Sequence, residues 1–162
     1  MKTFSFHVKK ITACCLAIIA LLLTSCMTPE AKVLNSLGEY DDYVIYSEGP
    51  FQDYTDYAKY HYTSVNMDEN NYFTKLREAD LIKINEHIDD FESWIETYKE
   101  RDDSLEIVVN YDFNREIIDT EDYIYIDSET QTWEDGTTLL VNYDVYFFDR
   151  QTQVLYYFHN NL

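Results

Sequence analysis

The chain has 162 residues, of which 31 are acidic and 12 are basic, so its formal charge at neutral pH is −19. A surface this acidic repels phosphate groups, which argues against nucleic acids and anionic lipid headgroups as partners of the folded part. Hydrophobic residues make up 46% of the chain and aromatic residues 17%. This much apolar material excludes a disordered chain and predicts a packed core.

Residues 1–25 have the three parts of a secretory signal. Lysines 2, 9 and 10 form a basic region, Ile11 to Leu23 form an apolar stretch, and Thr24-Ser25 provide the small residues of a cleavage site. The apolar stretch has 13 residues, whereas a helix that crosses a bilayer needs about 20. We therefore expect residues 1–25 to be a cleaved signal peptide instead of a permanent transmembrane anchor.

The stretch Leu23-Thr24-Ser25-Cys26 resembles the lipobox of bacterial lipoproteins, where an aliphatic and two small residues precede the cysteine that receives lipid. The resemblance, limited to the signal peptide and this motif, implies acylation of Cys26, including a palmitate chain. It also implies a position on the cell membrane or an outer envelope membrane, facing away from the cytoplasm. Cys14 and Cys15 leave with the signal, so Cys26 has no disulfide partner in its own chain. An ordinary cleaved signal with a free Cys26 thiol is the alternative.

Cleavage before Cys26 leaves 137 residues with 9 basic and 31 acidic side chains, and a formal charge of −22. This is a normal size for one domain. We expect residues 26–29 to form a short tether and residues 30–162 to form a single acidic domain. Because three residues extend only about 10 Å, the domain is expected to lie close to the membrane.

The first half of the domain is predicted to be mainly helical. Pro29 and Gly38 bound a short helix over residues 30–37. A short strand is centred on residues 43–46, and a second helix over residues 54–62 follows Asp53. A long amphipathic helix is predicted over about residues 78–100, because apolar residues recur there in steps of three and four.

The second half is predicted to be a sheet. Strands are expected at residues 105–113, 123–126, 139–148 and 153–158. Connections this short favour a four-stranded antiparallel meander with the long helix across one face, an α+β fold. This order looks like the cystatin-type and nuclear-transport-factor-type layouts. The resemblance covers residues 78–162 and implies a sheet curled around a helix.

Aromatic residues occur on both faces of the C-terminal hairpin, whereas a half-solvated sheet alternates more cleanly. The N-terminal helices are therefore expected to cover part of the second face, and a partner or ligand is the alternative. The residues predicted to form a binding face are Trp133, Asn142, Asp144, Tyr146, Phe148 and Tyr157.

Motifs of catalysis are missing from the sequence. It has no Gly-x-Ser-x-Gly motif, and its three glycines form no phosphate-binding loop. His61, His87 and His159 lack the spacing of a metal site. We therefore predict no catalytic residue, metal or cofactor, and a lipid-anchored module that binds another molecule, with a protein as the favoured partner. The alternatives are an envelope-polymer enzyme or accessory that uses carboxylates, and a carrier of a small ligand or cation.

Overall fold

The computed structural model describes residues 28–50 and 53–161. The predicted signal peptide and Cys26 lie outside the described residues. The chain divides after Ser36 into two units, which are described separately. In the first unit, helix α2 (Pro29–Ser36) matches the helix predicted over residues 30–37. The Thr28 hydroxyl accepts a hydrogen bond from the Ala31 backbone N–H and caps this helix, while Pro29 occupies its first turn.

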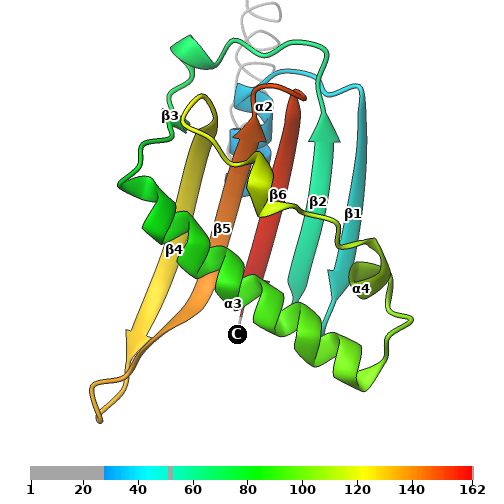
Figure 1. Ribbon diagram of the computed structural model, residues 1–162, viewed down its shortest axis with the longest axis vertical. Coiled ribbons are helices and arrows are strands. Elements are labelled where there is room, and N and C mark those ends of the chain that lie inside the picture. Colours follow the sequence, from blue (N-terminus) through cyan, green and yellow to red (C-terminus); the bar gives the residue numbers. More distant parts are fainter. Residues whose placement is uncertain (1–27, 51–52, 162) are drawn as a thin grey trace, which may run out of the picture. The chain divides into compact units, whose positions relative to one another are not determined.

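The second unit is an α+β domain built on a six-stranded antiparallel sheet with the order β1-β2-β6-β5-β4-β3 (Figure 1). Its strands are β1 (Asp42–Glu48), β2 (Thr55–His61), β3 (Thr74–Lys75), β4 (Tyr123–Thr132), β5 (Thr138–Asp149) and β6 (Val154–Asn161). The α+β class and the antiparallel order of the last three strands are as predicted. The prediction of four strands is wrong, because β1, β2 and β3 extend the sheet on both sides.

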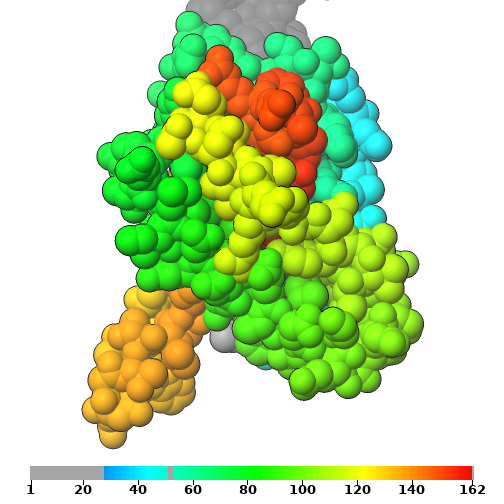
Figure 2. Space-filling view, viewed as in Figure 1, coloured from blue at the N-terminus to red at the C-terminus, as the bar shows by residue number. Residues whose placement is uncertain are grey.

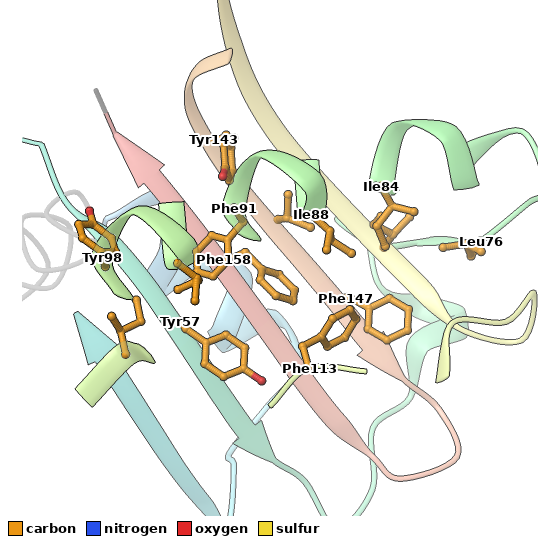
Figure 3. Close-up of a cluster of buried hydrophobic side chains, with 14 residues drawn as sticks. Tyr57, Leu76, Ile84, Ile88, Phe91, Tyr98, Phe113, Tyr143, Phe147 and Phe158 are labelled. Atoms are coloured by element: carbon orange, nitrogen blue, oxygen red, sulfur yellow. The ribbon is translucent and has the colours of Figure 1, made fainter. Parts of the chain in front are cut away.

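Helix α3 (Asp80–Arg101) lies across one face of the sheet, as Figure 1 shows. It begins two residues later and ends one residue later than the predicted helix over 78–100. Its apolar stripe, which includes Ile84, Ile88 and Phe91, is buried against Phe147 of β5 and Phe158 of β6 (Figure 3). Within residues 28–50 and 53–161, no helix is long and apolar enough to cross a membrane.

The helix predicted over residues 54–62 is wrong, because this segment is strand β2. Tyr57 is buried in the core on the helix side of the sheet. Ala58 and Tyr60, which lie on the opposite face of β2, are buried as well. A strand that is buried on both faces loses the apolar and polar alternation by which strands are recognised. Segment 55–61 is extended because it pairs with β1 on one side and with β6 on the other.

The strand predicted over residues 105–113 is also wrong. The segment contains the short helix α4 (Glu106–Asn110), in which Ile107 is buried while Val109 is 66% exposed. The Asn110 amide donates a hydrogen bond to the Glu106 carbonyl and supports the helical turn. Two single turns of 3₁₀ helix, η1 (Met67–Glu69) and η2 (Arg115–Ile117), complete the elements of this unit.

The hairpin of β4 and β5 projects beyond the helix layer, at the lower left of Figure 2. The β4–β5 register shifts between Glu129 and Thr130, which marks a bulge. Beyond the bulge, β4 has no neighbour on its outer side among the described residues, because β3 pairs only with Tyr123 and Ile124. The hairpin tip is therefore held only by its own two strands.

Candidate binding surfaces

The residues predicted to form a binding face divide into two groups. Alternation along β5 places Asn142, Asp144, Tyr146 and Phe148 on the face opposite α3, and Tyr157 of β6 is the register partner of Tyr146. The rings of Tyr146 and Tyr157 lie with centroids 4.8 Å apart. Trp133 lies apart from them in the turn of the projecting hairpin, where its backbone N–H donates to the Thr137 carbonyl.

The aromatic part of this face is buried. Tyr146, Phe148 and Tyr157 are each at most 4% exposed. Phe73 lies against Tyr146 with ring centroids 6.4 Å apart, and Tyr62 lies against Phe148 at 6.2 Å. The segment that joins β2 to β3 thus contributes to a second core. These aromatic side chains contribute to packing of the second unit and do not form an open recognition patch.

The polar residues of the same face form one row across the strands. Pairing aligns Asp56 of β2, His159 of β6, Asp144 of β5 and Asp127 of β4. The Asp144 Oδ1 atom lies 2.8 Å from His159 Nδ1 and accepts a hydrogen bond of 2.7 Å from the Tyr157 hydroxyl. The Tyr54 ring covers the imidazole at 4.6 Å between centroids. These contacts fix the orientation of the His159 ring.

A histidine oriented by a carboxylate also occurs in nucleophilic catalysis, where the second ring nitrogen activates a hydroxyl or thiol. Here the buried Nε2 atom of His159 has no hydrogen-bond partner among the described residues. No nucleophile is therefore positioned on the imidazole. The His159–Asp144 pair is best interpreted as a buried polar contact that connects β5 to β6.

Two carboxyl groups have a raised pKa, as general acids in hydrolases often do. Burial raises the pKa of Asp90 on α3, and the Tyr143 hydroxyl donates to this carboxylate over 3.0 Å. Burial also raises the pKa of Asp122, which accepts backbone hydrogen bonds from Asp119 and Arg150. Each carboxylate thus belongs to a different local structure. Neither carboxylate lines the cavity at Tyr72 and Lys83 or the cavity at Trp94 and Tyr98.

A metal centre receives no support from the geometry. Within the part of the chain that the structure describes, no three His, Cys, Asp or Glu side chains are grouped so that they could hold an ion. Several acidic side chains form ion pairs with lysine or arginine instead. Lys75 with Glu121 and Arg115 with Glu92 are examples.

An exposed aromatic patch occurs on the outer strand β1. Tyr43 and Ile45 are 49% and 45% exposed on the same face of this strand, and Tyr40 precedes them. The Tyr43 ring stacks on Tyr60 with centroids 5.8 Å apart, and Tyr40 meets Tyr43 edge-on at 5.1 Å. We call Tyr40, Tyr43 and Ile45 the β1 patch.

The β1 patch combines features that favour protein recognition. β1 is the terminal strand of the sheet, so one of its backbone edges has no strand partner among the described residues. Tyrosine contributes large, rigid contact area at low entropic cost. The sequence predicted the strand at residues 43–46 but not the patch. The alternate positions of Tyr43 and Ile45 in the sequence place both side chains on one face of the strand, and this spacing could have indicated the patch.

Comparison with known proteins gives no guide to function: no family model, no curated protein and no solved structure matches this chain.

Proposed function

We propose that this chain is a lipid-anchored lipoprotein whose domain binds another protein outside the cytoplasm and catalyses no reaction. The anchor rests on Leu23-Thr24-Ser25-Cys26 and on the basic and apolar stretches that precede it. The membrane, either the cell membrane or an outer envelope membrane, is its first partner. Because α2 begins three residues after Cys26, only about 10 Å of chain separates the acylated cysteine from the first helix.

The single observation that supports binding is the β1 patch. The outer edge of β1, on which α4 packs, has no strand partner among the described residues. Its backbone N–H and C=O groups can pair with an extended segment of a partner, and Tyr43 and Ile45 offer side-chain contacts beside it. Glu39, Asp41 and Asp42 are exposed around the patch. Complementary charge then favours a partner segment with basic side chains.

The anchor is tested by changing its acceptor residue. In cells given an alkyne analogue of palmitate, the parent protein should carry label and fractionate with membranes. Cys26→Ser should lose the label and leave the membrane, because no other cysteine follows the cleavage site. If the parent protein remained in the membrane without any label, the lipoprotein proposal would be wrong.

The partner is sought with a photocrosslinker placed at a single position. With p-benzoylphenylalanine at position 43, irradiation of intact cells should yield a discrete protein adduct. The matched control places the same residue at position 82, because Ile82 is 69% exposed on α3, away from the patch. Equal adducts at both positions, or none at position 43, would contradict binding through β1. Hydrolysis of envelope polymers by the purified protein would favour the enzyme alternative.

The finer assignment of the fold is likewise a proposal. We propose that the domain is related in layout to the cystatin-type and nuclear-transport-factor-type folds. The support is the order of elements, in which the long helix α3 is followed by three consecutive antiparallel strands, β4, β5 and β6. Such layouts host unrelated functions, so this assignment adds nothing to the proposed activity.

A further inference from the structure

A buried amide group at the end of the helix-side core has an unused donor. Asn160 of β6 is 1% exposed, and its Oδ1 atom accepts a hydrogen bond of 3.0 Å from the Thr55 hydroxyl. The Thr55 hydroxyl also lies 2.9 Å from the Tyr98 hydroxyl of α3. The Asn160 Nδ2 atom is buried and has no partner among the described residues. Because a buried donor without an acceptor is costly, this group is suited to bind one.

Asn160 lines a cavity of about 450 Å³. Trp94 and Tyr98 contribute its aromatic wall from the last two turns of α3, and Gly49 and Pro50 line it from the loop after β1. Tyr98 lies at the opposite end of the core from Leu76 in Figure 3. The volume of the cavity is in the range of sites for small organic molecules, about 300–1,000 Å³. A few polar groups in an aromatic wall are typical of such sites.

Gly49 and Asp53, which both line the cavity, approach each other closely. Gly49 has φ of +125°, and a Cβ atom there would lie 2.2 Å from the Asp53 carbonyl oxygen. Only glycine fits both this conformation and this contact. The chain therefore turns back on itself at Gly49, and Asp53 lines the same cavity.

The charges around the cavity select against anions. Arg101 forms an ion pair with Glu48, and its guanidinium lies 5.2 Å from the centroid of the Tyr98 ring. This pair is neutral as a unit, and the Asp53 carboxylate leaves an excess of negative charge. An anionic ligand would also meet a strongly acidic protein.

We propose that this cavity binds an uncharged aromatic molecule with a carbonyl or amide oxygen. The ring packs on Trp94 and Tyr98. Because Asn160 Nδ2 is buried and not accessible from the empty cavity, the Asn160 side chain turns on binding so that Nδ2 donates to the ligand oxygen. This site is separate from the β1 patch and does not depend on the lipid anchor. It makes the chain a binder of a small ligand in addition to any protein partner.

The probe is N,N-dimethylbenzamide, which is aromatic and uncharged and accepts hydrogen bonds without donating any. The full-length chain with Trp133→Phe keeps Trp94 as its only tryptophan. Titration should change Trp94 fluorescence saturably with a dissociation constant on the order of 1 mM or tighter, as fits a ligand of this size. Benzoate, the anionic counterpart, should bind at least fivefold more weakly.

Asn160→Asp tests the hydrogen bond, because it keeps the acceptor for Thr55 and replaces the donor by a second oxygen. Affinity for the probe should fall at least tenfold. The matched control is Asn142→Asp on the other face of the sheet, which should change affinity less than twofold. The absence of saturable binding by 20 mM, or an unchanged affinity in Asn160→Asp, would overturn the proposal.

A second measurement does not depend on the stability of the variant. In the proton–nitrogen NMR spectrum of the full-length chain, the side-chain amide signals of Asn160 should shift on addition of the probe, whereas those of Asn142 should stay in place. Equal or absent shifts at Asn160 would contradict the assigned contact.

Discussion

The two faces of the sheet share strands but differ in chemistry. The face under α3 is filled mainly by Ile and Phe side chains, with Phe91 and Phe158 at its centre. The opposite face of the same strands carries Tyr146 and Tyr157 beside the Asp144–His159 contact. Apolar packing is non-directional and stabilises the fold, whereas hydrogen bonds favour one strand register over others. The comparison suggests that the first face supplies most of the stability and that the second fixes the alignment.

The largest effect is expected from a large-to-small substitution under α3. Phe91→Ala should lower the free energy of unfolding by about 3–5 kcal/mol, because it leaves a cavity among the rings of Tyr57, Tyr111 and Phe158. Urea denaturation of the full-length chain followed by circular dichroism measures this loss. Phe91→Leu, which retains most of the volume, should cost less than half as much. A loss below 1 kcal/mol for the alanine variant would mean that this face is not the main core.

A smaller loss is expected on the opposite face. Asp144→Ala removes the acceptor of both Tyr157 and His159, which are buried, and should cost about 1–3 kcal/mol. Asp127→Ala is the matched control, because Asp127 is the exposed neighbour of Asp144 on β4 and should change stability by about 0.5 kcal/mol at most. If both variants lost the same amount, the row would have no special role in aligning the strands.

His87, a buried polar residue of α3, is expected to make the stability of the domain depend on pH. Burial lowers the pKa of His87 on α3 below its usual 6.5, despite the Lys83 carbonyl 2.8 Å from Nδ1 and the nearby Glu86 and Asp90 carboxylates. The unfolded chain therefore binds the proton more readily, and stability falls as pH decreases below about 6.5. Each unit by which the pKa is lowered contributes about 1.4 kcal/mol.

His87→Leu should remove this contribution. The difference in unfolding free energy between the parent chain and the variant should shift in favour of the variant from pH 7 to pH 5, and should stay constant from pH 7 to pH 8. A difference that does not change from pH 7 to pH 5 would show that His87 has the same pKa in the folded and unfolded chains. Denaturation at fixed pH values provides the measurement.

The smallest effect on stability is expected at the β1 patch, outside both cores. Tyr43→Ser removes an exposed ring that stacks on Tyr60, and should cost about 0.5 kcal/mol. The same substitution should reduce recovery of the partner protein at least fivefold in a pull-down from cells. If stability fell by several kcal/mol instead, the patch would be part of the core and its proposed role in binding would be lost.

Amphipathic periodicity was a reliable guide where one face of an element is buried. Helix α3 was predicted within two residues at each end because Leu81, Ile84 and Ile88 repeat at helical spacing. Strands β5 and β6 were located although both of their faces are buried, because they are rich in aromatic and β-branched residues and are separated by the turn at residues 149–152. The α+β class could therefore be predicted from the sequence alone.

Secondary structure was predicted wrongly where the buried residues of a segment do not recur with a simple period. Strand β2 is buried on both sides and reads as a helix, whereas residues 105–113 alternate like a strand but include α4, in which Val109 is exposed. In both segments, contacts with distant parts of the chain override the local pattern.

The candidate sites show the same limit. Alternation correctly placed Asn142, Asp144, Tyr146 and Phe148 on one face of β5, and part of this face was expected to be covered. The sequence did not predict that the segment between β2 and β3 would contribute to the cover. The cavity at Asn160 joins the end of α3 to β6 and to the loop after β1. No spacing in the sequence connects these three segments, so this site is visible only in the folded chain.

The position of β6 has a consequence for biogenesis. This strand is the last of the sheet in chain order, yet it lies inside the sheet between β2 and β5. Among the described residues, it is the only strand that pairs the β1–β2 hairpin with the other strands. A growing chain can close its sheet only after residue 161 has been made, and most of its long-range pairing waits until then. Such a delay would keep the unfinished chain loosely folded during synthesis, which is compatible with the export that we propose for it.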